Sequence, residues 1–316
     1  MRLIASLLMP VTVLVGQSPQ FRFDAGHTGQ AAGPARIPQG MAWRVDTGGR
    51  VRGTPAATAD LVVVGNDRGD LVAVHPKDGR VHWKQRLGTA LSSPTLLGDV
   101  VIVMGRDNVL RAFAQADGSP RWSTRLGEDL LMKGDPRRWD YWVCSPAVAE
   151  ARVFVGSGDG AVYAVDPRRG KVIWRTPTGG WVRSTPAVVD GLVYVGSYDG
   201  KVHALEAETG RPRWAFDTKG AVLAAPAVKE GRVIVGSRSA AVFALDAKTG
   251  ALQWRSPIPN GCWVVTPAAI AEGLVVIGTS DERYLAALDF ATGRERWRLD
   301  TQYRVFSAPL IQGGLV

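Results

Sequence analysis

The chain has 316 residues, 46% of them hydrophobic and 21% charged, which is enough apolar material for a buried core and excludes a disordered chain. Its formal net charge is +9, but the arginines and lysines are scattered and form no basic run. A solvated basic surface is therefore favoured over nucleic-acid binding, and peripheral contact with an acidic membrane surface stays open.

The N-terminal residues differ from everything that follows. After a single charged residue, Arg2, residues 3–15 are apolar. Because this stretch is short for a membrane span, residues 1–18 are predicted to be a secretory signal, with an uncleaved membrane anchor as the alternative. No Cys stands within residues 16–22, so a lipoprotein acylation site is absent. We expect a periplasmic or extracellular protein whose Gly- and Pro-rich residues 19–41 form an extended leader.

From residue 42 to residue 316 one sequence frame recurs. The frame is Ala-x5-Gly-x3-Trp, and each copy follows a Pro and, ten or eleven residues after that Pro, a Gly. The six frame tryptophans are Trp83, Trp122, Trp174, Trp214, Trp254 and Trp297. A unit that recurs about every 40 residues and contains several short β-rich runs indicates a repeat fold.

Residues 184–216 show what one repeat contains. A short apolar run begins at Pro186, which can stand only at a strand start because it lacks an N–H. A Val- and Tyr-rich run follows, then the Asp199-Gly200 hairpin signal, an alternating run and a last run that ends at Trp214. We therefore predict four short antiparallel strands per repeat.

Tryptophans that share one repeat position are predicted to be packing units, each docking its indole on the neighbouring unit. A single four-stranded sheet cannot bury both of its faces, so the units must stack around a ring. Such a ring is an all-β β-propeller, and it would occupy residues 42–316. The predicted docking set is Trp43, Trp83, Trp122, Trp174, Trp214, Trp254 and Trp297.

The two ends of the repeat region predict how the ring closes. Trp43 has the spacing to Pro55 that marks an outer strand, but no frame precedes it. Ser307-Ala308-Pro309 opens one more inner strand. We expect six complete blades and an incomplete closing blade, with Trp43 in an outer strand beside the Pro309 strand. The ring would be seven- or eight-bladed and truncated at the C-terminus.

One interval breaks the period. Trp122 and Pro146 are 24 residues apart, whereas the other Trp-to-Pro intervals measure 11 to 13 residues. The extra residues fall within 128–142 and join an outer strand to the next inner strand, on the face where such loops surround the channel mouth. They form either a binding surface or a plain surface insertion. The charged and aromatic residues of this insertion are Lys133, Arg137, Arg138, Trp139, Tyr141 and Trp142.

A second pattern points to the same mouth. The third and fifth positions before each inner-strand Pro share one strand face, because side chains alternate along a strand with a period of two. The basic and aromatic residues of that set are Arg50, Arg52, Tyr141, Trp181, Arg183, Arg304 and Phe306. Converging arginines and rings would suit an anionic, partly aromatic ligand or an acidic peptide.

Other chemistry is not indicated. The four histidines lack metal-ligand spacing, and no serine nucleophile elbow or phosphate-binding glycine loop is present. Cys144 and Cys262 belong to different repeats, so no disulfide is expected between them. Asp67, Asp159 and Asp199 occupy recurring hairpin turns, where a short polar side chain forms the turn. We predict no catalytic residue and no metal site.

Two segments carry a family resemblance. Val-Tyr-Val-Gly-Ser-Tyr-Asp-Gly (193–200) and Ala-Leu-Asp-Ala-Lys-Thr-Gly (244–250) resemble the pyrroloquinoline-quinone (PQQ) repeat, in which the recurring frame is the tryptophan-docking motif. The leader sequence Phe-Arg-Phe-Asp-Ala-Gly-His-Thr-Gly (21–29) resembles the start of many bacterial secreted members. The resemblance spans about residues 21–316. The family includes quinone-dependent dehydrogenases, the BamB-type outer-membrane assembly factor and members with no assigned activity.

The resemblance implies two different functions. PQQ dehydrogenases of this fold are much longer and carry a vicinal Cys-Cys ring and a Ca²⁺ site, whereas this sequence has no Cys-Cys pair. The BamB type is nearer in length and has no cofactor, although it is a lipoprotein. We therefore predict a monomeric, non-enzymatic scaffold that binds a protein partner in the cell envelope without PQQ. A small PQQ-dependent oxidoreductase and a sensor domain for an anionic ligand are the alternatives.

Overall fold

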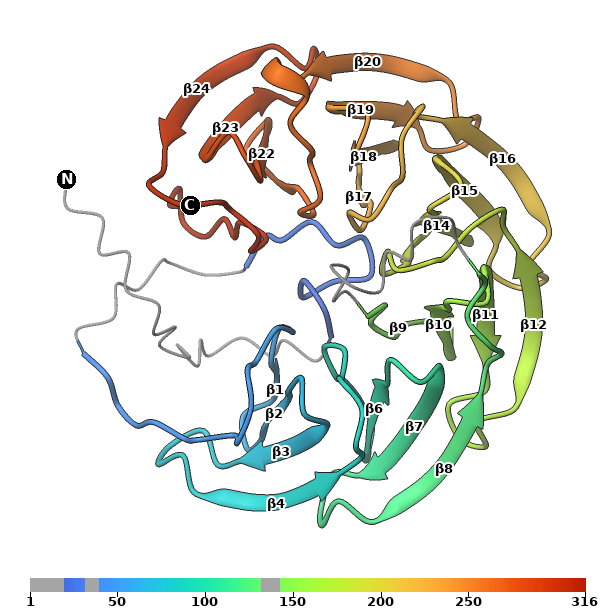
Figure 1. Ribbon diagram of the computed structural model, residues 1–316, viewed down its shortest axis with the longest axis vertical. Helices are drawn as coiled ribbons and strands as arrows, with labels where there is room; N and C mark the ends of the chain where they lie inside the picture. Colours follow the sequence, from blue (N-terminus) through green and yellow to red (C-terminus); the bar gives the residue numbers. More distant parts are fainter. Residues whose placement is uncertain (1–19, 32–39, 132–142) are drawn as a thin grey trace.

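The computed structural model describes residues 20–31, 40–131 and 143–316 and shows an all-β ring (Figure 1). Within these residues the chain forms six four-stranded antiparallel sheets, each built from strands that are consecutive in sequence. The only helix in the described ranges is a 3-10 turn, Pro259–Gly261. The sheets follow one another around the ring in chain order, so the predicted β-propeller is confirmed.

Each sheet, or blade, contains one copy of the sequence frame. The strands of the first three blades are β1 (Ala56–Ala57), β2 (Val62–Gly65), β3 (Asp70–Val74), β4 (Val81–Arg86), β5 (Thr95–Leu97), β6 (Val100–Met104), β7 (Val109–Ala114), β8 (Pro120–Arg125), β9 (Ala147–Ala149), β10 (Arg152–Gly156), β11 (Ala161–Val165) and β12 (Val172–Pro177). The strands of the last three are β13 (Ala187–Val189), β14 (Leu192–Gly196), β15 (Lys201–Glu206), β16 (Pro212–Asp217), β17 (Ala227–Lys229), β18 (Arg232–Ser237), β19 (Ala241–Asp246), β20 (Leu252–Pro257), β21 (Ala269–Ala271), β22 (Leu274–Gly278), β23 (Tyr284–Asp289) and β24 (Glu295–Asp300). The first strand of each blade is short and lies toward the ring centre, and the fourth forms the rim (Figure 1).

The alanine of the frame has a specific place in each blade. It faces the frame Trp across the third and fourth strands, as Ala204 faces Trp214. Immediately after this Ala the register of the two strands shifts, in this blade between Ala204 and Leu205. The same shift recurs in all six blades. A small residue therefore stands opposite the large indole at the point where a bulge bends the outer strand pair.

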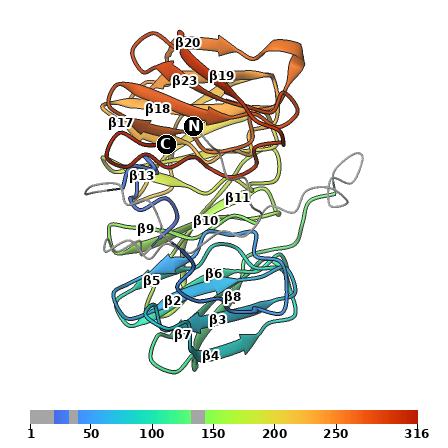
Figure 2. The ribbon, with the colours of Figure 1, turned by 90° about the vertical axis from the view of Figure 1, so that its left-hand side faces the viewer.

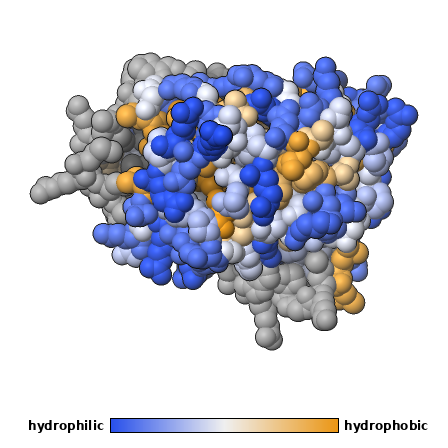
Figure 3. Space-filling view, turned by 90° about the horizontal axis from the view of Figure 1, so that it is seen from above, coloured by the Kyte–Doolittle hydropathy of each residue, from blue (hydrophilic) through white to orange (hydrophobic). Residues whose placement is uncertain are grey.

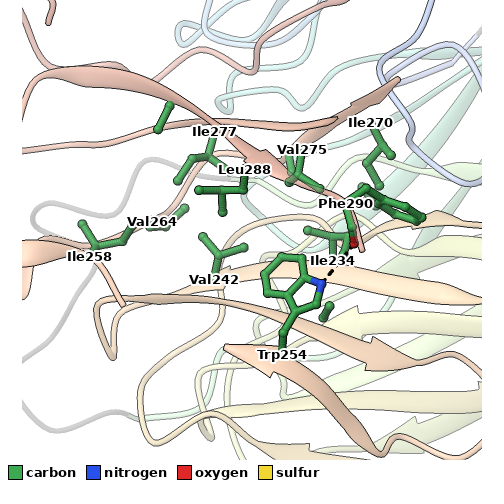
Figure 4. Close-up of a cluster of buried hydrophobic side chains, with 14 of the residues drawn as sticks. Ile234, Val242, Trp254, Ile258, Val264, Ile270, Val275, Ile277, Leu288 and Phe290 are labelled. Carbon is green, nitrogen blue, oxygen red and sulfur yellow. Dashed lines mark hydrogen bonds between the residues drawn. The ribbon is translucent and has the colours of Figure 1, made fainter. Parts of the chain in front are cut away.

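The glycine and tryptophan of the frame meet across neighbouring blades. The Trp254 indole donates its Nε1–H to the Phe290 carbonyl at 3.1 Å (Figure 4). A Cβ on Gly293 would lie 2.5 Å from the Trp254 ring, and Gly293 has a φ of 70°, so a side chain is disfavoured there on both grounds. Ile270 and Leu288 of the next blade pack in the same buried cluster as the indole.

The same contact recurs around the ring. Five other indoles likewise donate to the carbonyl three residues before the next frame Gly, at 2.8 to 3.0 Å. The pairs are Trp43–Pro76, Trp83–Gln115, Trp122–Pro167, Trp174–Ala207 and Trp214–Ala247. Trp83, Trp174 and Trp254 are buried. Trp297 is 37% exposed, and within the described residues no following frame Gly lies beneath it.

The two ends of the ring differ from the sequence prediction. No strand is assigned at Trp43, although its indole packs beside valines of β2 and β3. The segment that begins at Pro309 pairs with the leader and not with the Trp43 segment, because Ile311 forms a parallel bridge with Gln30. In the complete blades the first and fourth strands never pair, since two middle strands separate them. Among the described residues, no backbone hydrogen bond joins the Trp43 segment to the Pro309 segment.

The leader also departs from the extended conformation that was expected. Residues 20–26 form turns and bends, with positive φ at Arg22 and Phe23, and His27 has a positive φ as well. The leader crosses the middle of the ring, where it is drawn in blue in Figure 1. In the side view it lies on one face, opposite the face toward which residues 126–131 leave β8 (Figure 2). We call these two faces the leader face and the loop face.

The described residues begin after the predicted N-terminal targeting segment. Residues 1–18, for which a secretory signal or an uncleaved anchor was predicted, lie outside them. In the ranges that are described, no helix is long and apolar enough to cross a bilayer. The outer surface on the side of β20 and β24 is mainly hydrophilic, with small apolar patches (Figure 3).

Candidate functional site

Two kinds of connection build the loop face. One joins the outer strand of a blade to the next inner strand, and the other is the hairpin between the second and third strands. Backbone hydrogen bonds tie them together at equivalent positions: the Tyr198 N–H donates to the Trp181 carbonyl at 2.9 Å, and the Arg238 N–H donates to the Ala221 carbonyl at 3.0 Å. This pairing places side chains from neighbouring blades next to one another.

Five of these side chains, two arginines and three aromatic residues, form a row in the order Arg183, Trp181, Tyr198, Arg238 and Trp263. The Arg183 guanidinium lies 4.9 Å from the centre of the Trp181 ring, and that ring is 5.7 Å from the Tyr198 ring. The Arg238 guanidinium lies 5.2 Å from the Tyr198 ring and 4.5 Å from the Trp263 ring. Each of these distances is within the range of attraction between a cation and a ring face or between two rings. We call these five residues the aromatic–arginine row.

The two ends of the row differ in accessibility. Trp181 is only 1% exposed and donates its Nε1–H to the Leu130 carbonyl at 2.9 Å. Arg183 is buried as well, and its guanidinium lies 3.3 Å from the Asp129 carboxylate. Trp263, in contrast, is 42% exposed. The charge of Arg183 is therefore already paired inside the protein, and the accessible end of the row is at Trp263.

The other predicted arginines of the inner-strand starts are exposed. Arg50 and Arg52 precede blade 1, and the Arg52 guanidinium lies 3.7 Å from the Asp67 carboxylate. Arg304 precedes the Pro309 segment and forms an ion pair of 2.9 Å with Asp281. Exposed pairs of this kind contribute little to stability, so these arginines remain available to a partner that offers a better anion.

Phe306, the remaining aromatic residue of the predicted face, is 47% exposed. Together with Arg304 it lines a shallow depression of about 450 Å³, whose other lining residues are Arg283, Gln302 and Tyr303. The residues Lys133, Arg137, Arg138, Trp139, Tyr141 and Trp142 of the insertion lie outside the described residues.

The sequence-based set did not contain Tyr198, Arg238 or Trp263. Tyr198 and Arg238 lie in hairpins, two residues after the recurring Gly of their repeats. Trp263 is a tryptophan outside the Ala-Gly-Trp frame and shortly before an inner-strand Pro, as Trp181 is. A search for tryptophans that the frame does not explain would have found both.

The aspartates of the hairpin turns have structural roles in this structure. The Asp199 carboxylate accepts the Lys201 and Gly179 N–H groups and lies 2.9 Å from the His203 ring. Burial alone would raise the pKa of Asp199, but the His203 ring and the two N–H groups lower it to about 2. Asp159 likewise accepts a backbone N–H within its own turn. Among the residues described, no three His, Cys, Asp or Glu side chains are grouped as metal ligands would be.

The two cysteines are buried free thiols. Burial raises the pKa of the Cys144 thiol to about 12, although it accepts the Gly156 N–H. The Cys262 sulfur accepts the Asp281 N–H. A thiol that is buried and stays protonated is a poor nucleophile, so the geometry gives Cys144 a packing role.

One protein-family model matches the sequence of this chain over nearly all of the propeller. The model described as the outer membrane protein assembly factor BamB matches residues 39–138, 135–261 and 242–316. The chain belongs to this family, whose members are built from PQQ-like propeller repeats. No curated protein matches the sequence.

Solved structures of the same fold come from proteins of different kinds. BamB from Moraxella catarrhalis has a TM-score of 0.76 and 19% identity, over 88% of this chain and 85% of that one. A europium-containing methanol dehydrogenase has a TM-score of 0.77 and 13% identity, over 96% and 81%. The quinohemoprotein alcohol dehydrogenase ADHIIG from Pseudomonas putida HK5 has a TM-score of 0.64 and 13% identity, over 94% and 74%. At these identities the likeness is one of fold.

Proposed function

We propose that this protein is a non-enzymatic scaffold of the cell envelope that binds a protein partner through its loop face. The observation that carries the proposal is the aromatic–arginine row, which ends at the exposed Trp263. Trp, Tyr and Arg are the residues most enriched at the energetic centres of protein interfaces. Because the row spans blades of a rigid ring, little side-chain freedom is left to lose on binding.

Family and charge support the same function. The matching family model is that of an outer-membrane assembly factor, and the BamB structure shares the fold. A formal net charge of +9 favours encounter with an acidic partner. Contact with the exposed Arg50, Arg52 and Arg304 would make that encounter sensitive to salt. Arg137, Arg138, Tyr141 and Trp142 remain part of the proposed surface as residues of the insertion.

The test is capture of the partner from the native envelope fraction by single variants. Trp263→Ala and Arg238→Ala should each weaken capture by about 2 kcal/mol or more, roughly a thirtyfold loss of affinity, if they lie at the centre of the interface. Arg213→Ala is the matched control, because Arg213 is an exposed arginine on an outer strand, paired with Glu206. Capture that is equal in all three variants would place the interface elsewhere on the ring.

Arg183 is unsuitable for this test even though the sequence points to it. Its side chain is buried against Asp129 and the Trp181 ring, so Arg183→Ala would remove an ion pair and a packed side chain from inside the protein. A loss of capture would then mix folding with recognition. The exposed Arg52 and Arg304 can be changed together to Ala instead, and their loss should mainly weaken the salt-dependent part of binding.

A PQQ-dependent oxidoreductase is the second candidate, because a methanol dehydrogenase shares the fold. The rings and arginines of the loop face would suit a planar, anionic cofactor. Among the described residues no three His, Cys, Asp or Glu side chains are grouped, and the sequence has no Cys-Cys pair. Incubation with PQQ and Ca²⁺ separates the two functions: quinone absorbance together with dye-linked alcohol or sugar oxidation would favour the oxidoreductase.

A sensor domain for a small anion would use the same side chains. It predicts a rise in Tm with an anionic ligand and no envelope protein captured by the loop face. Localisation in the periplasm follows from the proposed signal at residues 1–18, and cell fractionation with N-terminal sequencing of the mature protein tests it.

A further inference from the structure

The leader forms backbone hydrogen bonds with four successive inner segments of the ring. In one bond to each segment an inner-segment amide donates to a leader carbonyl, and at the last segment the Ala31 N–H also donates to the Ile311 carbonyl at 3.0 Å. The pairs are Val188 to Ala25 at 2.7 Å, Val228 to Gly26 at 2.7 Å, Ile270 to Thr28 at 2.8 Å and Ile311 to Gly29 at 3.0 Å. The Val148 amide, one blade earlier, donates to the side-chain oxygen of Gln20 at 3.0 Å.

These amides are equivalent by repeat. Val188, Val228 and Ile270 each stand opposite the second residue of the following strand, in the same register. The N–H groups at this register point away from the blade and toward the ring centre, so they are unused by the sheet. The inner strands of blades 4 to 6 therefore present regularly spaced amide donors, and the described leader supplies the carbonyls that they need.

Arg22 fastens the leader at one end of this row. Its side chain is buried and donates to the Ala268 carbonyl at 2.7 Å, the Pro309 carbonyl at 2.9 Å and the His27 carbonyl at 3.3 Å. One side chain thus joins the leader, blade 6 and the Pro309 segment. A Cβ on Gly29 would lie 1.8 Å from the guanidinium, so this binding mode requires Gly29.

The docked leader also carries polar groups at a cost. Both ring nitrogens of His27 are buried without a well-formed hydrogen bond among the described residues, although the Pro226 carbonyl lies near the ring. Within the same ranges no carboxylate forms an ion pair with Arg22, which has only carbonyl acceptors. Burying polar groups with incomplete partners opposes docking, whereas each blade is held together by three antiparallel strand pairs. The leader is therefore held more weakly than the ring on which it lies.

We propose that the leader face is a peptide-binding site whose resident ligand is the chain's own leader, held as a releasable latch. The site recognises an extended backbone through the inner-segment amides and an arginine through the Ala268 and Pro309 carbonyls. Release exposes the amides of Val188, Val228 and Ile270 together, because one segment covers all three.

Hydrogen exchange on the intact chain tests the latch. At neutral pH the Val188, Val228 and Ile270 amides should exchange together and about a hundredfold faster than the Val193 and Val233 amides, which lie in the middle strands. Arg22→Lys keeps the charge but loses the planar fork, and it should speed exchange of the first group alone. Arg213→Lys is the matched control and should change neither group. If the leader-facing amides exchange only in step with Val193 and Val233, the leader is an integral part of the fold and the proposal is wrong.

A peptide with the sequence of residues 20–31 tests the site itself. A fluorescently labelled copy should bind the full-length Arg22→Ala chain about tenfold more tightly than the wild-type chain, because the wild-type leader competes at high effective concentration. The same peptide carrying Arg22→Ala should bind neither chain. The absence of binding to a folded Arg22→Ala chain would contradict a peptide site. If that variant does not fold, the exchange pattern of the wild-type chain decides alone.

Discussion

The leader face and the loop face lie on opposite sides of the ring and present different chemical groups to a ligand. On the leader face the inner strands leave backbone amides unused, and a segment of the same chain supplies carbonyls to them. On the loop face the backbone groups at the equivalent connections already bond to one another, so what is presented outward is side chains. Recognition through the backbone depends little on residue type, whereas recognition through side chains depends on it strongly.

The two faces therefore depend on different residues of the sequence. The leader motif at residues 21–29, which resembles the start of secreted family members, has a structural task because Arg22 and Gly29 hold the leader on the ring. The candidate partner site instead includes Tyr198, Arg238 and Trp263, which belong to no motif.

The largest expected loss of stability is at a frame tryptophan that packs between two blades. Trp254→Ala removes an indole that is 8% exposed and bonded to Phe290, and it should lower the free energy of unfolding by about 3–5 kcal/mol. Trp297→Ala, at the same frame position but 37% exposed, should cost about 1 kcal/mol or less. Urea unfolding of both variants measures this. Equal losses would mean that contact with the next blade is not what stabilises these indoles.

A smaller effect is expected on the leader face. Gly29→Ala places a Cβ against Arg22 and also strains a residue with φ of 63°, so it should cost about 2–3 kcal/mol as the leader loses its place. Gly191→Ala is a close control, because its φ is 73° but no atom lies within 4 Å of the added Cβ. It should cost about 1 kcal/mol, the backbone term alone. Chemical denaturation compares them, and equal costs would show that the Arg22 contact is unimportant.

Acid should loosen the leader face and not the loop face. Burial, and then the nearby Arg22 charge, lowers the pKa of His27 from 6.5 to about 3, while the Pro226 carbonyl opposes the shift. A lowered pKa means that the unfolded or released state binds more protons. The stabilisation is therefore complete above about pH 6.5 and is lost as the pH falls toward 3. At about pH 5 the loss should reach about 2 kcal/mol.

Hydrogen exchange at the Val188 and Val228 amides measures this loss across pH, after correction for the intrinsic exchange rates. His27→Leu should flatten the profile between about pH 7 and pH 5. A profile that stays equally steep without the imidazole would assign the pH dependence to other groups.

The smallest expected effect on stability is at the accessible end of the row. Trp263→Ala should cost about 1 kcal/mol or less because the ring is 42% exposed. Trp181→Ala should cost about 3–5 kcal/mol because that ring is buried and bonded to Leu130. Thermal unfolding of both variants measures the difference. A large cost at Trp263 would make the whole row a structural element and would weaken its assignment as a partner site.

The fold could be predicted from sequence because its determinants repeat. Six copies of Ala, Gly and Trp at one spacing predict repeated units that stack so that each indole packs on the next unit. The prediction of a strand at Trp43 beside Pro309 was wrong because it was based on spacing alone. Spacing locates an indole along the chain, but a strand also needs a neighbouring strand to pair with, and none is present there among the described residues.

The candidate site could be predicted only in part. Strand alternation correctly identified Trp181 and Arg183 as neighbours. It could not show that Arg183 is already paired with Asp129 and that the Trp181 indole is already bonded to the Leu130 carbonyl. Tyr198 and Arg238 approach each other from hairpins of different blades, and only the closed ring brings such positions together. The leader motif at residues 21–29 did not indicate where the leader docks, because most of its contacts to the ring use backbone groups that every residue carries.

Site-specific photo-crosslinking tests the central claim, that the loop face binds a protein partner, most directly. A photoreactive phenylalanine analogue at Trp263 in the intact chain should form an adduct with one envelope protein in living cells. The same group at Ile173, which is 47% exposed on the outer strand β12, should form none. Adducts that form equally at both positions, or only at Ile173, would contradict a binding site on the loop face.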